Sequence, residues 1–392
     1  MPQEYNNIVN IPGIIVTHMN GINPIHMGAA YLGKTSCPKC GGEKLRKKKK
    51  LNRKIRHESI GNRQCILHIE TYQFQCKKCE KYFHQPLPGI QKWQRSTESF
   101  KEEIYRKHHL GISQTALAKL AHLGSATIER WTHYFLERKE REVSYRTCPK
   151  YLGLDEHRFT RKQGFATTFC DLNNNRIMDI TLGRSEKSLR PFLMSLEGRD
   201  NVEMVSIDLS ESYRSIVKHY FPKARITADR FHVMRLVNQS FLRTFQALDP
   251  RVKESRGLSR LLCKHKWRVD ARQELLLKDY FLNHPEVKSI YEFKQSLCRL
   301  LSLKSQTYRQ SKPLVKELLQ YIEQLQHSHF SDLGRLGNTL HNWREEVSCM
   351  WRYTKNNGIT EGFHRYFKLI QRRAFGFKNF YNYRLRVIAL CC

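Results

Sequence analysis

The sequence has no long apolar run. Although 40% of its 392 residues are hydrophobic, no stretch approaches the roughly 20 uninterrupted apolar residues that a membrane-spanning helix needs. The opening segment, interrupted by Asn6, Asn10 and Pro12, also lacks the basic-then-apolar order of a secretory signal. We therefore expect no membrane segment and a cytoplasmic protein.

Acidic residues are scarce. The chain carries 36 Asp and Glu against 69 Lys and Arg, which leaves a formal charge of +33. Such an excess makes the free surface repel itself unless a polyanion neutralises it. Nucleic acid is therefore the expected partner. The 20 Phe and 18 Tyr can fill the cores of a globular chain of two or three domains.

The cysteines do not form the pattern of a disulfide framework. Of the 12 cysteines, four fall in two Cys-x-x-Cys pairs, Cys37 with Cys40 and Cys76 with Cys79, which suits a reducing compartment. Four thiolates from two tight turns match tetrahedral zinc and leave no open position for catalysis. We predict a structural zinc site; the alternative is four unligated core cysteines.

The segment between the two pairs is the most basic part of the chain. Cys40 and Cys76 are 36 positions apart, so we expect the basic run 44–56 to be a loop projecting from a zinc ribbon at 31–88. Its charges would neutralise DNA phosphates; the alternative is a solvated charge run or a localisation signal. Residues 1–30 are expected to form an irregular leader. The residues predicted to contact DNA are Lys47, Lys48, Lys49, Lys50 and Arg53.

Residues 94–142 have helical periodicity. Ser96, Ser113 and Ser125 can each start a helix, and each is followed by apolar residues at three-to-four spacing. A short turn at 122–124 joins the last two helices, as in a helix-turn-helix. In that motif the second helix enters the major groove; a plain helical hairpin is the alternative. The contact candidates are Ser125, Thr127 and Arg130.

Residues 148–392 change to a mixed α/β order. Short apolar runs predict strands, and a basic, Leu-rich stretch at about 235–345 predicts a helical insertion. A last amphipathic helix is expected from about Thr360. The expected strands are 151–154, 165–169, 177–182, 202–207 and 225–227, with helices at 185–196 and through Tyr213 and Ile216.

Three acids in this region occupy positions where a metal site could form. Asp155 follows the first expected strand, Asp208 ends the fourth, and Glu361 begins the last helix. Carboxylate oxygens are the ligands that magnesium requires, and two such ions roughly 4 Å apart can act on one phosphorus. The alternative is that these acids are solvent-facing or helix-capping residues.

Five short blocks carry a further signal. They are 151–156 (YLGLDE), 205–210 (VSIDLS) with Tyr213, 228–233 (ADRFHV), 357–362 (NGITEG) and 368–377 (KLIQRRAFGF). Together they resemble the blocks of ISL3-family insertion-sequence transposases. The resemblance extends over nearly the whole chain, since that family has a zinc ribbon and a helix-turn-helix in front of its catalytic part. The long step between the cysteine pairs departs from the family's tighter spacing.

The resemblance implies an α/β, RNase H-like catalytic domain whose Asp-Asp-Glu triad is interrupted by a helical insertion. Asp155, Asp208 and Glu361 would be the catalytic residues and would bind magnesium or manganese. Asp229 and His232 lie in a family block, and we expect them to orient neighbouring groups rather than to bind the metal.

The function implied is that of a transposase, which binds the terminal inverted repeats of an insertion sequence. It would hydrolyse a phosphodiester at the element's end and join the freed 3′ hydroxyl to target DNA, as a homo-oligomer associated with the nucleoid. Alternatives are a zinc-ribbon and helix-turn-helix regulator without nuclease activity, an RNase H-like nuclease or resolvase that cuts without joining, and a relative that has lost activity. Further DNA contacts are expected on the last helix, from Arg365, Lys368 and Arg372.

Overall fold

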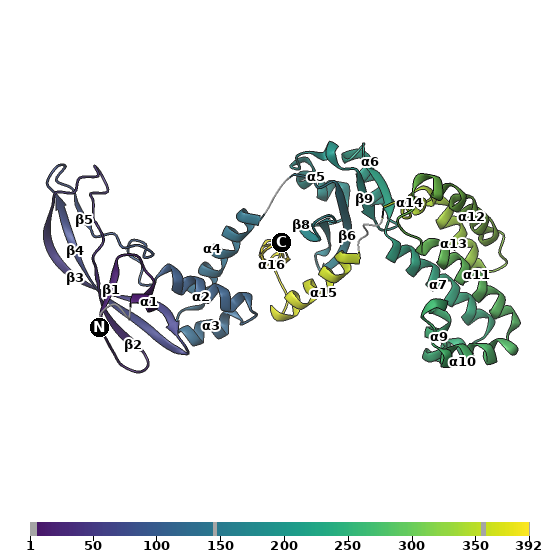
Figure 1. Cartoon of the computed structure of the whole chain (residues 1–392), viewed down its shortest axis with the longest axis horizontal. Coiled ribbons are helices and arrows are strands. Elements are labelled where there is room, and N and C mark those ends of the chain that lie inside the picture. Colours follow the sequence, from purple (N-terminus) through teal and green to yellow (C-terminus); the bar gives the residue numbers. More distant parts are fainter. Residues whose placement is uncertain (1–5, 144–146, 354–357, 392) are drawn as a thin grey trace. The chain divides into compact units, whose positions relative to one another are not determined.

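The computed structural model describes residues 6–143, 147–353 and 358–391. The chain forms two compact units, Met1–Lys139 and Glu140–Cys392 (Figure 1). No helix within the described ranges is long and apolar enough to cross a membrane.

The first unit is built on a five-stranded sheet. Its strand order is β1-β2-β4-β3, with β5 paired to β4. The long strands β3 and β4 form an antiparallel hairpin, whereas β2 runs parallel to β4. Buried apolar side chains, among them Val16, Met27, Ile55 and Leu67, form its core. The elements are α1 (Asn6–Val9), β1 (Ile14–Asn20), β2 (Ile25–Tyr31), β3 (Leu45–Ile60), β4 (Arg63–Cys76) and β5 (Tyr82–His84).

Two predictions for this unit were wrong. The segment expected to be an irregular leader contains β1 and β2, because apolar residues such as Ile14, Val16 and Met27 are buried in the sheet. The basic run expected to be a loop lies in β3. Lysine has a low strand propensity on its own, but pairing with the long strand β4 overrides that preference.

Three helices follow the sheet, as predicted. They are α2 (Glu98–His109), α3 (Gln114–Ala121) and α4 (Ser125–Val143). Ser113 caps α3 by accepting a hydrogen bond from Ala116 N at 3.2 Å, whereas Thr97, not Ser96, caps α2. His122 ends α3 in the left-handed conformation, with φ of 47°, so the turn before α4 is short.

The second unit has a five-stranded sheet of order β10-β9-β6-β7-β8. Strands β6, β9 and β10 are parallel neighbours, and β7 and β8 continue the sheet antiparallel. All five strands lie where apolar runs predicted them. Strand β6 is longer than expected because β7 pairs with it as far as Thr160. The strands are β6 (Tyr151–Thr160), β7 (Gly164–Asp171), β8 (Arg176–Leu182), β9 (Met204–Ile207) and β10 (Arg225–Ala228).

Helices account for most of the remaining chain in this unit. They begin with α5 (Glu186–Met194) and α6 (Glu211–Tyr220), and the last two are α15 (Gly358–Arg373) and α16 (Phe380–Cys391). The helices between β10 and α15 are α7 (Arg230–Leu248), α8 (Arg251–Glu254), α9 (Arg256–Cys263), α10 (Ala271–Leu282), α11 (Pro285–Ser302), α12 (Tyr308–Gln326), α13 (Ser331–Asn342) and α14 (Arg344–Cys349), with short 3₁₀ turns at Arg199–Asn201 and Lys266–Arg268.

Both faces of the second sheet are covered by helices. On one face, Leu189 of α5 and Tyr213 of α6 share a core with Leu152 and Val205 of the sheet. On the other face, α15 and α16 contribute to a separate core that includes Tyr383. Helix α14 packs against the edge strand β10, and helices α7 to α13 gather beyond it (Figure 1). The acids at the strand ends therefore lie in a largely apolar environment.

Candidate metal centres and DNA-binding surface

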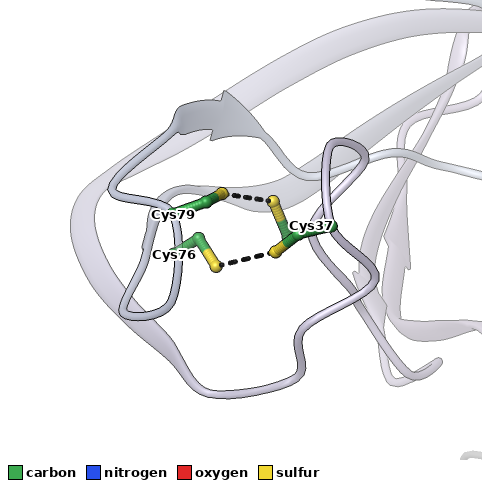
Figure 2. Close-up of side chains that lie close together, drawn as sticks. Cys37, Cys76 and Cys79 are labelled. Carbon is green, nitrogen blue, oxygen red and sulfur yellow. Dashed lines mark hydrogen bonds between the residues drawn. The ribbon is translucent and has the colours of Figure 1, made fainter.

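The two Cys-x-x-Cys pairs meet at one end of the β3/β4 hairpin (Figure 2). The four Sγ atoms all lie within 4.8 Å of one another. The distance is 3.5 Å between the sulfurs of Cys37 and Cys79, and 3.6 Å between those of Cys40 and Cys76. Four sulfurs at about 2.3 Å from a tetrahedral zinc ion lie about 3.8 Å apart. The four residues therefore fit zinc.

Tight turns hold these cysteines in place. Gly41 N donates to Cys37 O at 2.9 Å, and Glu80 N donates to Cys76 O at 3.0 Å. Gly41 and Glu80 both have positive φ, which tight turns of this kind require. The rings of Phe74 and Phe83 pack against the sulfurs from the adjoining strands. Because all four thiolates come from the chain and the site is closed, its role is structural.

The acids Asp155 and Asp208 lie on neighbouring parallel strands. Asp155 lies inside β6, not after it as predicted, and Asp208 directly follows β9. Strands β6 and β9 pair through Leu152 with Val205 and the residues after them, which brings both carboxylates to the same edge of the sheet. Asp229 follows β10, and its N donates to Ile207 O at 2.6 Å.

The electrostatics of these acids are unusual. Burial raises the pKa of Asp155 to about 8, and the charges of Asp229 and Asp208 add to the effect. Burial also raises the pKa of Asp208 to about 6, although His232 opposes it. Within the described ranges Asp208 Oδ1 is buried without a hydrogen-bond partner, and neither acid forms an ion pair with Lys or Arg. Buried carboxylates without a counter-charge suit a divalent cation.

The block 228–233 divides its work among its residues. Asp229 caps α7 by accepting a hydrogen bond from Phe231 N at 3.2 Å. Arg230 donates through Nη2 to Met350 O at 2.6 Å and so anchors α7 to the segment after α14. His232 Nε2 lies 3.6 Å from Asp229 Oδ2 and 3.9 Å from Asp155 Oδ1. His232 therefore contacts two acids of the cluster at once.

Sequence reasoning missed a chain of polar contacts that ends on Asp155. His364 Nδ1 lies 3.6 Å from Asp155 Oδ2, and its Nε2 lies 3.1 Å from Thr168 Oγ1. Thr168 Oγ1 lies 3.0 Å from His157 Nδ1, whose Nε2 is 2.9 Å from Tyr383 OH. Burial lowers the pKa of His364 to about 4 and that of His157 to about 3, so both rings are neutral at neutral pH.

Two sequence signals could have found these histidines. His157 comes two residues after Asp155, so both side chains lie on the same face of β6. His364 comes three residues after Glu361 on α15, and residues three apart are neighbours on a helix surface. The side chain of Glu361 itself lies outside the described part of the chain, so the position of its carboxylate remains a prediction.

The predicted DNA contacts lie mostly at the surface. Lys47, Lys48, Lys49 and Lys50 are exposed along β3. Lys50 Nζ lies 2.7 Å from Glu70 Oε2, and Lys47 Nζ lies 4.3 Å from the centre of the Tyr72 ring. Arg53 is half-buried and donates through Nη2 to Gln94 O at 2.7 Å, so it also holds the fold.

The remaining candidates lie on helices. On α4, Ser125 and Arg130 are exposed and Thr127 is half-buried. On α15 the three cationic candidates are exposed: Arg365, Lys368 and Arg372. Contact of these individual residues with DNA remains a prediction.

Comparison with known proteins matches both units. A family model of ISL3 DDE type, described as a transposase, matches residues 152–387. A second, described as the zinc-finger of transposase IS204/IS1001/IS1096/IS1165, matches residues 33–79. These matches define the class as transposases with an N-terminal zinc finger. Because the first match covers more than half of the chain, the protein belongs to the ISL3 family of transposases.

A curated relative agrees with this assignment. The transposase for insertion sequence element IS1001 of Bordetella parapertussis is 22% identical over 355 residues, covering 88% of this chain and 85% of the relative. The resemblance predicted from the sequence blocks is thus confirmed, as are the DNA transposase function and the structural zinc ribbon. The alternative of a regulator without enzymatic activity is not favoured.

Proposed function

We propose that this transposase cuts and joins DNA strands at a divalent metal centre formed by Asp155, Asp208 and Glu361. The main support is the pair Asp155 and Asp208, which are buried on neighbouring parallel strands without a cationic partner within the described ranges. Glu361 precedes His364 by one helical turn of α15, and His364 contacts Asp155. This spacing favours a position for Glu361 beside the other two acids.

The strand order also supports an RNase H-like catalytic domain. Three strands in antiparallel succession lead to two parallel strands, and helices cover both faces of the sheet. The long run of helices α7 to α14 separates β10 from α15, which fits a helical insertion before the last acid. Asp229 and His232 would orient Asp155 rather than bind the metal.

The proposed reaction has two steps. In cleavage, a water oxygen bonds to phosphorus at the element's end and the 3′ oxygen leaves as a hydroxyl. In joining, that 3′ hydroxyl bonds to a target phosphorus and displaces a target 3′ oxygen, so no further water is consumed. Magnesium or manganese, when bound, supplies the positive charge that stabilises the phosphate under attack. The three carboxylates would hold that charge in place and fix the position of the scissile phosphate.

DNA binding would come from several surfaces. The hairpin lysines, helix α4 as the second helix of a helix-turn-helix, and the basic face of α15 would contact the terminal repeats and the target. The formal charge of +33 supports an extended contact with phosphates. Action on two ends at once would require a homo-oligomer.

The test uses the full-length chain and labelled DNA that carries the ends of the element, with magnesium. Asp155→Asn, Asp208→Asn and Glu361→Gln should each lower cleavage and joining by on the order of a thousandfold while end binding is retained. Glu211→Gln is the matched control, because that acid lies three positions from Asp208 and its side chain is 68% exposed. Cleavage at the control's rate by any of the three variants would contradict the assignment.

A further inference from the structure

A hollow in the first unit has no role in the function proposed so far. Its volume is ≈ 1290 Å³, and it is bounded by β3, β4, β5, the segment 85–96 and the turn between α3 and α4. None of the residues that line it is acidic. The basic side chains that line it are Arg53, Lys54, Arg56, Lys81, Lys92 and Arg95. The hollow is therefore complementary to an anion.

Backbone and arginine contacts brace the hollow. Arg56 N donates to Arg95 O at 2.8 Å, and Thr97 N donates to Arg56 O at 2.9 Å, which ties segment 85–96 to β3. Arg56 also donates through its guanidinium to Ala121 O, next to the turn before α4. Arg53 and Arg56 are thus engaged by the fold, and other cations remain for a ligand.

The lysines of the hollow are available for a ligand. Lys54, Lys81 and Lys92 are exposed, and across residues 6–143 none of the three forms an ion pair with an acid. Lys92 Nζ lies 5.5 Å from the centre of the Trp93 ring. Cationic side chains therefore stand beside an aromatic surface.

Two large aromatic rings at this hollow are exposed to solvent. Trp93 is 72% exposed and Tyr82 is 54% exposed. The ring of His84 meets that of Trp93 edge-on, with centroids 5.1 Å apart. Trp93 also has φ of 66°, a conformation that costs about 1–3 kcal/mol for a residue other than glycine. Exposed rings beside a cationic groove are typical of proteins that bind single-stranded nucleic acid.

We propose that this hollow binds a short stretch of unpaired DNA, with bases stacked on Trp93 and Tyr82 and phosphates held by the three lysines. Bases in a duplex are stacked on one another and cannot offer their faces to these rings, whereas unpaired bases can. The inference deepens the proposed function, because cutting and joining strands at a duplex end creates unpaired nucleotides.

Fluorescence anisotropy of the full-length protein without magnesium tests this proposal. The probes are a labelled oligothymidine, the same strand paired in a duplex, and a polyglutamate peptide. Trp93→Ala should weaken oligothymidine binding about 5- to 150-fold, since one stacked base contributes about 1–3 kcal/mol. Trp93→Phe should recover most of the loss, and the duplex should be unaffected. Trp267→Ala, which removes a 54% exposed Trp in the second unit, should change nothing.

Three results would overturn the proposal: equal weakening of duplex and oligothymidine by Trp93→Ala, no weakening of either, or polyglutamate binding as tight as that of oligothymidine. Cleavage of element-end DNA with magnesium, measured in parallel, separates this proposal from the previous one. If the wild type cleaves but shows none of the oligothymidine pattern, only the hollow's role fails. If the pattern holds but no cleavage occurs, the proposed function fails and a single-strand-binding site remains.

Discussion

In the first unit four thiolates lie within 4.8 Å of one another, whereas in the second unit Asp155 and Asp208 lie on neighbouring strands and Asp208 Oδ1 has no hydrogen-bond partner among the described residues. The thiolate site is closed by the chain itself. The acid cluster is left with uncompensated charge. One region therefore depends on its metal for stability, and the other retains a destabilising arrangement that a metal and a substrate would complete.

The same two regions differ in the sign of their pH dependence. In the first unit, burial lowers the pKa of His57 to about 4, although a backbone hydrogen bond of Val9 and the charge of Glu103 oppose it. In the second unit, burial raises the pKa of Asp155 to about 8. Folding of the first unit thus disfavours a proton that the unfolded chain would bind, and folding of the second favours one that the unfolded chain would release.

Zinc removal should have the largest effect. Structural zinc contributes about 10–16 kcal/mol in zinc-finger peptides, so Cys76→Ser should abolish zinc binding and expose the backbone of residues 33–84 to hydrogen exchange. Zinc content and hydrogen exchange with mass spectrometry measure both effects. Cys349→Ser, which changes a half-buried cysteine of the second unit, is the control. Full zinc content in the Cys76→Ser variant would contradict the closed-site interpretation.

Acid should weaken the first unit through His57. The ring is neutral in the folded state down to pH about 4, but in the unfolded chain it gains a proton below about 6.5. This contribution is complete above pH 6.5 and is lost as the pH falls to 4, by about 3 kcal/mol in total. Hydrogen exchange of residues 55–69, corrected for intrinsic rates, should show this slope. His57→Gln should flatten it, and an unchanged slope in the variant would refute this explanation.

The histidine beside the acid cluster should affect catalysis less than the acids do. His364→Ala removes the contact with Asp155 Oδ2, and loss of a residue that positions a metal ligand typically costs about 10- to 100-fold. Cleavage should fall by that amount, and the magnesium concentration for half-maximal rate should rise. Tyr366→Ala, at an exposed position of the same helix, should leave both unchanged. Unaltered magnesium dependence in His364→Ala would argue against a positioning role.

Alkali should weaken the second unit by a smaller amount. Asp155 keeps its proton in the fold up to pH about 8, whereas the unfolded carboxyl is already ionised. Stability should therefore fall by about 2 kcal/mol between pH 6.5 and 8, a range in which His157 and His364 are neutral in the fold and largely so in the unfolded chain. Asp155→Asn should remove this slope in hydrogen exchange of residues 204–217, and added magnesium should oppose it. A slope that survives in Asp155→Asn would contradict the raised pKa.

The sequence predicted the second sheet well, because each strand carries a run of buried apolar residues. It also predicted that Asp155 and Asp208 would meet, since both were assigned to strands that proved to be parallel neighbours. The first sheet was harder. Lys47 to Lys50 have little intrinsic preference for a strand, and only the pairing with β4 across the hairpin places them in one.

The polar contacts around Asp155 could not be predicted from local patterns. Tyr383 OH reaches His157 across 226 positions of sequence, and Thr168 reaches His364 across 196. A periodicity assigns residues to faces of helices and strands, but it does not say which faces meet. The same reason explains why the hollow beside Trp93 was not foreseen, since its walls come from two strands, a loop and a helical turn.

Manganese binding measured by electron paramagnetic resonance tests the central claim most directly. The full-length, zinc-loaded protein should bind Mn²⁺, and Asp155→Asn, Asp208→Asn and Glu361→Gln should each lose most of that binding, whereas the exposed control Glu211→Gln should not. Wild-type Mn²⁺ binding by Glu361→Gln, or by both aspartate variants, would contradict a centre formed by the three acids.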